Sequence, residues 1–116
     1  MGRIYTRVKI FFNDNCVENL NAFIDSGSDL TIIGTKVAKK LKIRTPIIER
    51  QWTASDGDER QSPIVEINIQ AEDDKEQIFL DEVLIDDGPL DQENNEEVII
   101  GLDYLQKAKK ILRFDD

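Results

Sequence analysis

The 116-residue sequence contains no histidine and only one cysteine, Cys16. Without histidine, the chain cannot form a Ser-His-Asp triad, a Cys-His pair or a histidine-based zinc site. A single cysteine excludes an intramolecular disulfide and a multi-cysteine metal site. It is compatible with a reducing compartment, so we expect a cytoplasmic protein. We also expect no metal or other cofactor. If the chain is an enzyme, carboxylates must carry its proton transfers.

Basic residues are the minority among the charges, with 15 lysines and arginines against 24 aspartates and glutamates. The net charge of −9 argues against a nucleic-acid partner, because phosphate neutralisation needs a basic surface and the longest basic cluster lies within residues 36–42. No apolar run approaches the roughly 18 residues of a membrane span, so no membrane partner is expected. The length and the lack of a long linker predict one domain over residues 1–116.

Short segments of alternating or continuous apolar residues predict a mainly β protein. Residues 4–12 alternate with a period of two, and the turn-forming residues 13–15 predict a hairpin with the next strand. Asp81-Glu82 interrupts an apolar segment and predicts a bulge or bend rather than the end of a strand. Extended segments are expected at residues 4–12, 16–24, 30–33, 46–48, 65–71, 78–85, 98–100 and 111–114.

Two short helices are expected between these strands. Thr35 is the predicted N-cap of the first helix. The apolar faces comprise Val37, Ala38 and Leu41 in the first helix and Leu102, Leu105 and Ala108 in the second. Short strands with one or two brief helices indicate a barrel-like β domain.

Two loops have distinctive compositions. Ala54-Ser55-Asp56-Gly57-Asp58 predicts a tight turn, and the flanking segments can pair as a protruding hairpin over about residues 52–62. Trp52 is interpreted as a packing residue that, beside such a hairpin, also has the position to gate a cleft. Residues 86–97 are acidic, lack a periodic pattern and contain no basic residue, which predicts a solvated, mobile surface loop.

An acidic turn lies between two apolar segments in the N-terminal part of the chain. Asp25-Ser26-Gly27-Ser28-Asp29 follows Ala22-Phe23-Ile24 and precedes Leu30-Thr31-Ile32-Ile33. A carboxylate carried toward the interior by such neighbours must be hydrogen-bonded, paired or protonated, which are the conditions of a working acid or base. Taken alone, Asp-Ser-Gly is more often an ordinary surface turn. The apolar neighbours and a second motif favour the catalytic interpretation.

That second motif is Ile99-Ile100-Gly101, which precedes the second expected helix. Together with Phe23-Ile24-Asp25-Ser26-Gly27-Ser28, it resembles the two hallmark motifs of the retropepsin-like aspartic proteases, in the same order. The resemblance spans nearly the whole chain. It implies a closed acid-protease-type β-barrel, one lobe per chain, with a flap hairpin at about residues 52–62.

The resemblance implies a homodimeric aspartic endopeptidase, because the family's mechanism uses two carboxylates and this chain has one Asp-Ser-Gly motif. Two copies would each contribute Asp25, and the two carboxylates would activate a water between them. Two unit charges about 3 Å apart repel by ~5 kcal/mol at an effective dielectric near 20, so the pair should share one proton and work best at acidic to mildly acidic pH. By family analogy, the Ser26 hydroxyl hydrogen-bonds across the interface and Gly27 lets the backbone approach the pair.

The same resemblance implies a cleft for an extended peptide or protein substrate. Gly27 and Asp29 would hold the substrate backbone, Leu30 and Ile32 would line side-chain pockets, and the Ser28 hydroxyl would donate to Asp25. The hairpin turn would close over the peptide. The substrate-binding residues implied in this way are Gly27, Ser28, Asp29, Leu30, Ile32, Ala54, Ser55, Asp56 and Gly57.

The chain departs from the viral members of the family at two positions. Leu102 stands where viral members often carry a basic residue that braces the acidic residue after the first motif, here Asp29. Asp56 at the expected flap tip differs from the glycine-rich viral flap. A second hypothesis therefore stays open, in which a catalytically silent relative dimerises or binds an extended peptide without cutting it. The intact Asp-Ser-Gly motif favours the enzyme, because a structural module has little reason to bury like charges.

Overall fold

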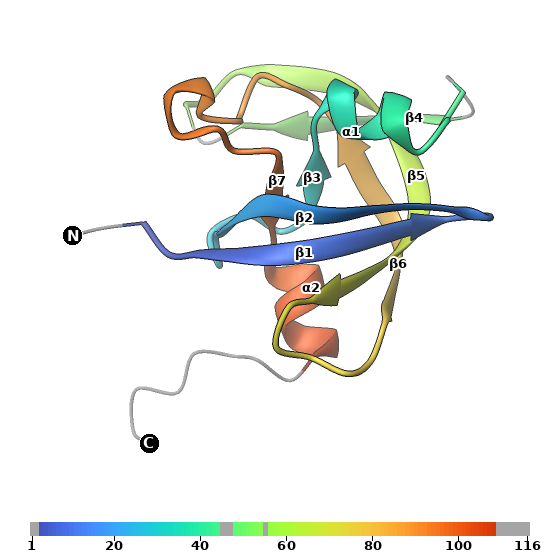
Figure 1. The fold of residues 1–116 in the computed structure, drawn as a ribbon. Helices are drawn as coiled ribbons and strands as arrows, with labels where there is room; N and C mark the ends of the chain where they lie inside the picture. The colour runs from blue at the N-terminus through green and yellow to red at the C-terminus, as the bar shows by residue number, and fades with distance from the viewer. Residues whose placement is uncertain (1–2, 45–47, 55, 109–116) are drawn as a thin grey trace.

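The chain forms a small β-barrel closed by six strands (Figure 1). The computed structural model describes residues 3–44, 48–54 and 56–108. Around the barrel the strand order is β1, β2, β7, β3, β6 and β5, and β5 pairs back with β1. The predicted mainly β, closed fold is confirmed. The strands are β1 (Tyr5–Phe12), β2 (Asn15–Ile24), β3 (Ile32–Ile33), β4 (Ile48–Thr53), β5 (Glu59–Ala71), β6 (Ile78–Ile85) and β7 (Val98–Ile100).

The hairpin of β1 and β2 is present as predicted. Asn13 adopts a left-handed conformation with φ of 52°, which a short polar side chain tolerates at a tight turn. Val8 and Ile10 of β1 and Leu20 and Ala22 of β2 are buried. They form part of the core that the barrel encloses.

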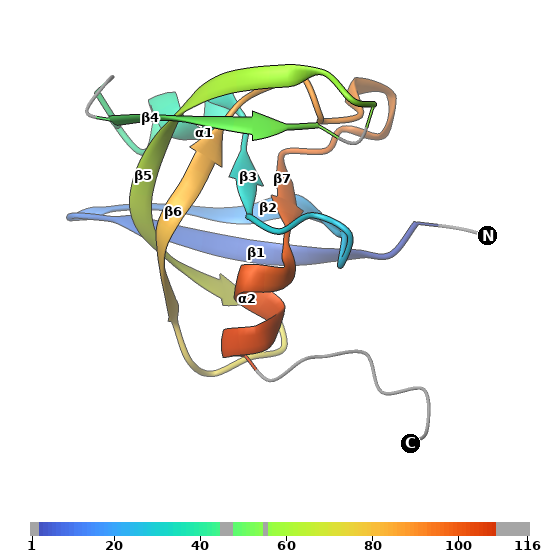
Figure 2. The same ribbon diagram turned by 180° about the vertical axis from the view of Figure 1, so that it is seen from behind.

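β7 lies between β2 and β3, parallel to the first and antiparallel to the second. Ile24 at the end of β2 is paired with Ile100, and Ile32 of β3 is paired with Ile99. Because parallel strands end at the same edge of a sheet, the two motifs that follow β2 and β7 are brought side by side. In the view from behind, the loop between β2 and β3 lies between β4 and α2 (Figure 2).

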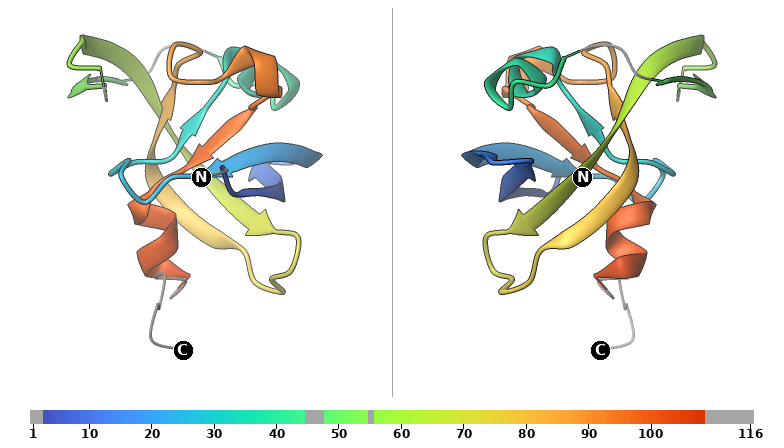
Figure 3. Two further views of the ribbon diagram at one scale, coloured as in Figure 1. Left: turned by 90° about the vertical axis from the view of Figure 1, so that its left-hand side faces the viewer. Right: turned by 90° about the vertical axis from the view of Figure 1, so that its right-hand side faces the viewer.

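The long strand β5 connects the barrel with a projecting hairpin (Figure 3). Its first half pairs with β4, and its later residues pair with β6 and β1. Val65 is opposite Val83, but Ile67 is opposite Leu80, so β6 has one extra residue between these pairs. The predicted bulge at residues 81–82 is therefore confirmed.

Two α-helices pack against the barrel, α1 (Thr35–Lys40) and α2 (Leu102–Lys107). The prediction that Thr35 caps α1 is wrong, because Gly34 occupies the N-cap position and Thr35 is the first helical residue. The backbone N–H of Thr35 instead donates to Oδ1 of Asp87 at 2.8 Å, so a carboxylate from a distant loop supplies the acceptor. Within the described part of the chain, no helix is long and apolar enough to cross a membrane.

The predicted apolar faces of the helices are largely correct. Val37, Ala38 and Leu41 are buried as expected. In α2, Leu105 is buried with Tyr104, whereas the other two predicted positions are only half-buried. Burial raises the pKa of the Tyr104 hydroxyl, which donates to Asp74 in the turn between β5 and β6. The predicted terminal strand at residues 111–114 and the extended residues 46–47 lie outside the described residues.

The expectation that residues 86–97 are solvated throughout is wrong for Leu90 and Glu96, which are 7% and 3% exposed. The segment contains a short 3-10 helix, η1 (Gln92–Asn94). The Glu96 carboxylate accepts hydrogen bonds from Arg3 and Tyr5, both at 2.7 Å, and from the backbone N–H of Asp91 at 3.0 Å. Three donors compensate the burial of this charge, so the loop is tied to the N-terminal strand.

Candidate active site

The acidic turn begins where β2 ends. The backbone N–H of Asp25 donates to the carbonyl of Ile100 at 2.9 Å, which continues the pairing with β7 by one residue. The N–H of Gly27 donates to Oδ1 of Asp25 at 3.0 Å, and the N–H of Ser28 donates to the Asp25 carbonyl at 3.1 Å. Asp25 is therefore held in a tight, half-buried turn.

Backbone contacts with the second motif support this turn. A Cβ atom on Gly101 would lie 2.5 Å from the carbonyl carbon and oxygen of Leu30 and 2.7 Å from the carbonyl oxygen of Ser28. Only glycine permits the two backbones to approach so closely. The backbone N–H of Leu102 then donates to the Ser28 carbonyl at 2.7 Å, and that of Asp103 to the Asp29 carbonyl at 3.2 Å. The two motifs thus form one backbone-linked unit.

Thr31 and Asp103 complete the link, and the sequence did not reveal either role. Thr31 is fully buried, its hydroxyl donates to Oδ1 of Asp103 at 2.8 Å, and it accepts the N–H of Gly101 at 3.1 Å. Oδ2 of Asp103 also accepts the backbone N–H of Thr31 at 3.1 Å. An acidic residue in the first turn of the second helix is the one sequence signal that could have identified Asp103.

Replacing Thr31 by valine is expected to lower the free energy of unfolding by about 1–3 kcal/mol, because the buried N–H of Gly101 would lose its acceptor. Urea unfolding measures the change. Thr53→Val, at an exposed position, is the matched control and should shift stability by less than about 0.5 kcal/mol. Equal stability of the two variants would contradict the assigned role.

One expectation for the first motif needs correction, and the departure from the family at Leu102 has a visible consequence. The Ser28 hydroxyl does not donate to Asp25, since it donates to the carbonyl of Leu30 at 2.8 Å. A carbonyl two residues away lies within reach, and the N–H of Gly27 already occupies Oδ1 of Asp25. Within residues 3–44, 48–54 and 56–108 no ion pair braces Asp29, in agreement with the apolar Leu102; its backbone is held by Asp103 instead.

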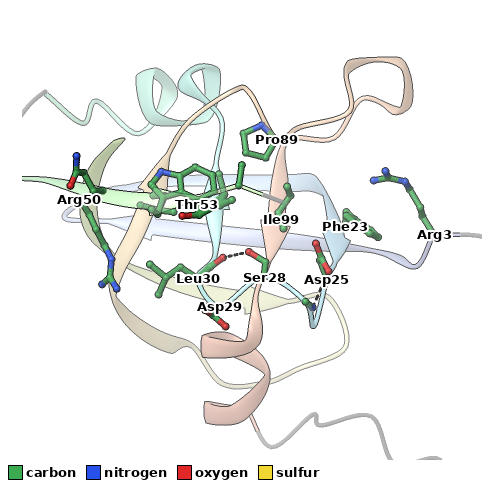
Figure 4. Close-up of a pocket in the computed structure, with 16 residues that line it drawn as sticks. Arg3, Phe23, Asp25, Ser28, Asp29, Leu30, Arg50, Thr53, Pro89 and Ile99 are labelled. Carbon is green, nitrogen blue, oxygen red and sulfur yellow. Dashed lines mark hydrogen bonds between the residues drawn. The ribbon is translucent and has the colours of Figure 1, made fainter. Parts of the chain in front are cut away.

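A cavity of about 470 Å³ lies between this turn and the projecting hairpin, and Asp25 points toward it (Figure 4). Among the predicted site residues, those that line it are Asp25, Gly27, Ser28, Asp29, Leu30, Ile32 and Ala54. Ile99 of the second motif also contributes to the wall. Ser26 is exposed and is not among the lining residues.

The hairpin of β4 and β5 covers the cavity and pairs over a longer range than predicted, from Ile48 opposite Ile64 to Thr53 opposite Glu59. Its turn is closed by a hydrogen bond from the N–H of Ala54 to the Asp58 carbonyl at 2.9 Å. Asp56 and Gly57 at the tip do not line the cavity, and Ser55 lies outside the described residues. The wall is therefore formed by residues 50–54, which belong to β4 and the start of the turn, and not by the tip of the hairpin.

Several lining residues were not predicted as site residues. One of them, Leu84, forms a small buried apolar cluster with the predicted Ile32 and Ile99. Leu90 belongs to this cluster without lining the cavity, and Trp52, a second unpredicted lining residue, packs on it. The cavity accordingly has an apolar floor suited to apolar side chains. The other lining residues outside the prediction are Arg3, Phe23, Arg50, Gln51, Thr53 and Pro89. Arg3 and Arg50 lie at opposite ends of the cavity (Figure 4), and Arg3 also packs over the ring of Phe23 at 4.5 Å.

The closed barrel, the interleaved β7 and the covered cavity define a retropepsin-like fold. No family profile and no curated protein matches the chain by sequence. Solved structures do match. The EIAV protease, solved with an inhibitor, is 22% identical with a TM-score of 0.60, over 97% of this chain and 94% of the other.

Two further structures are similar over most of their length. The Simian Foamy Virus (mac) protease is 17% identical with a TM-score of 0.54, over 95% of this chain and 100% of the other. The retroviral protease-like domain of Ddi1 from Leishmania major is 18% identical with a TM-score of 0.53, over 90% of this chain and 78% of the other. The chain thus has the retropepsin-like fold that its two motifs predicted.

Proposed function

We propose that this protein is an aspartic endopeptidase that works as a homodimer. The observation that carries the proposal is the half-buried Asp25, held by the tight turn at the wall of a covered, apolar-floored cavity. A carboxyl group in this position can accept a proton from a water when it is ionised, or donate one to a carbonyl oxygen when it is protonated. The chain has no histidine that could take either task.

A second copy of the chain is needed because peptide hydrolysis by carboxylates requires two groups. Among the described lining residues, only Asp25 and Asp29 carry carboxylates, and they occupy different ends of the turn. In the proposed dimer one Asp25 from each chain activates the water, with Ser26 and Gly27 next to the interface. One carboxylate of the pair removes the water's proton while the other protonates the carbonyl oxygen of the substrate.

The proposed substrate is a peptide in extended conformation. Leu30, Ile32, Leu84 and Ile99 present an apolar surface for side chains, and the hairpin covers the peptide from the other side. The backbone of Gly27 and Asp29 would bind the peptide backbone. Apolar residues beside the cleaved bond should therefore be preferred.

The second candidate function is peptide binding without cleavage. The apolar floor and the covering hairpin favour it, because they would hold a peptide whether or not a second Asp25 completes the site. Incubation of the purified protein with a peptide library between pH 4 and 7, followed by mass spectrometry, separates the two. Cleavage supports the endopeptidase; binding of peptides that all remain intact supports the binding module.

Dilution is expected to lower the specific activity, since each site needs two chains. Sedimentation should give roughly twice 13.3 kDa at concentrations where the protein is active. The specific activity should fall over the same concentration range in which the dimer dissociates. A monomer that keeps full activity at high dilution would contradict a shared site.

A further inference from the structure

A chain of two part-buried hydrogen bonds joins the wall of the cavity to the loop after β6. The indole N–H of Trp52 donates to the Ser62 hydroxyl oxygen at 2.8 Å, and the Ser62 hydroxyl donates to Oδ2 of Asp86 at 2.7 Å. Ser62 is only 1% exposed, and Trp52 lines the cavity. Trp52 and Ser62 belong to the two strands of the covering hairpin, whereas Asp86 directly follows the barrel strand β6.

The direction of this chain of hydrogen bonds is fixed by chemistry. An indole nitrogen can only donate and a carboxylate can only accept, so the single hydroxyl proton of Ser62 must be directed to Asp86. Ser62 is then left with its lone pairs facing Trp52. The carboxylate thus determines the orientation of the serine, and the serine determines the position of the indole.

Asp86 is itself firmly held. Its Oδ1 accepts the backbone N–H of Gly88 at 2.7 Å and the Arg60 guanidinium at 3.1 Å. The guanidinium lies so close to Gly88 that a Cβ atom there would clash with two of its nitrogens. The Nε of Arg60 is buried and has no hydrogen-bond partner within the described part of the chain. Arg60 is therefore held by its ion pair with Asp86 and by packing.

From these contacts we infer that Asp86 is a positioning residue, which acts through Ser62 to fix Trp52 in the wall of the cavity and thereby sets the affinity for a peptide. Asp86 does not line the cavity, so it affects a bound peptide through lining residues that its contacts position: Trp52 through Ser62, and Pro89 through the adjacent Gly88. Ser62→Ala breaks the first route and leaves the second intact. The part of this inference that concerns peptide affinity rests on the proposed function; the part that concerns Trp52 does not.

The expected kinetic effect is a change in KM with little change in kcat. Loss of the carboxylate should raise KM by roughly tenfold, because a Trp52 side chain that is no longer fixed must be ordered when the peptide binds, and ordering one side chain costs about one tenfold step in an equilibrium constant. The turnover number should change by less than about threefold, since the interaction is made equally in the bound substrate and the transition state.

Trp52 is the only tryptophan, so its fluorescence reports on this position alone. In Asp86→Ala and in Ser62→Ala, emission should move to longer wavelength and acrylamide should quench it more strongly. The double variant should show no further change, because both substitutions break one chain of contacts. Asp86→Asn retains an oxygen that can accept from Ser62 and should lie closer to the unchanged protein.

Asp87→Ala is the matched control. Asp87 is the neighbouring carboxylate, but its hydrogen bonds are to Thr35, so its loss should lower stability and leave Trp52 emission and KM unchanged. Circular dichroism identifies any variant that does not fold. If Asp86→Ala does not fold, the emission and quenching of Trp52 in Ser62→Ala decide whether this chain of hydrogen bonds positions the indole. Unchanged Trp52 emission and quenching in folded Asp86→Ala or Ser62→Ala protein would overturn the inference.

The two proposals fail in different ways. If the unchanged protein cleaves no peptide, the endopeptidase is rejected, and binding of an apolar statine-containing hexapeptide replaces KM as the measure of affinity. Weaker binding together with altered Trp52 emission in Asp86→Ala supports the inference. Altered emission with unchanged peptide affinity overturns the claim that Asp86 sets affinity, whatever the catalytic result.

Discussion

Replacement of Asp25 by asparagine is expected to lower kcat/KM for peptide cleavage by at least about 10³-fold, within the range that general acid–base groups contribute. An amide has no proton to give at these pH values and cannot take one from water. In the proposed dimer the substitution removes both carboxylates at once, because each chain supplies the same residue. No other titratable group in the turn can replace them, since Asp29 lies four residues further on.

The fold should survive this substitution. The asparagine retains a side-chain oxygen that can accept the N–H of Gly27, the contact that closes the turn at Asp25. Dimer mass and the unfolding midpoint are therefore expected to match those of the unchanged protein. Asp81→Asn, at an exposed site outside this cavity, is the matched control and should cleave normally. Cleavage that persists in a homogeneous Asp25→Asn sample would reject the carboxylate pair.

The individual strands were predictable because they depend on local patterns, whereas the closed barrel was expected from the resemblance of the two motifs to the retropepsin-like family. The alternation in residues 4–12 identified β1, and Ile99-Ile100-Gly101 identified β7 and the glycine that follows it. Burial on one face of a strand produces such a pattern in any protein of this class. The position of Asp25 at the end of a buried strand followed from the same apolar neighbours.

The contacts that hold the site together were not predictable, because each joins polar residues that are far apart in the sequence. Asp87 and Glu96 belong to a stretch with the composition of a solvated acidic loop. Asp87 nevertheless accepts hydrogen bonds from Thr35 at the start of α1, and Glu96 is buried and pairs with the exposed Arg3. Nothing in the order of residues distinguishes these acids from their exposed neighbours. Only the packing of the loop against the barrel selects them.

Competition between nearby acceptors explains the error at Ser28. Its hydroxyl can reach either the carboxylate of Asp25 or the carbonyl of Leu30, and the sequence contains both within three residues. The N–H of Gly27 satisfies the carboxylate oxygen that faces the turn, so the hydroxyl bonds to the carbonyl. Which acceptor a serine hydroxyl takes depends on the geometry of the turn, and the spacing of residues in the sequence does not determine that geometry.

Replacement of Gly101 by alanine is expected to cost about 3 kcal/mol of unfolding free energy and to abolish most of the peptidase activity. The added methyl group would lie 2.5 Å from backbone atoms of Leu30 and 2.7 Å from the Ser28 carbonyl oxygen. Backbone atoms cannot rotate away as a side chain can, so the two motifs must separate. The cost in unfolding free energy should lie at the upper end of the range measured for overpacked cores. The reduced entropy of the unfolded chain would offset less than about 1 kcal/mol of this.

Activity should suffer because separation of the motifs also loosens the hydrogen bond between Thr31 and the Gly101 N–H, which lies behind the Asp25 turn. Gly88→Ala is the instructive control, since its added methyl group meets an even closer neighbour, the guanidinium of Arg60. That group is the end of a side chain, so only the ion pair of Arg60 with Asp86 has to rearrange and no backbone has to move, and the stability loss should be smaller. Urea unfolding of both variants decides the argument: if Gly88→Ala costs as much as Gly101→Ala, close backbone contact is not what makes glycine necessary at position 101.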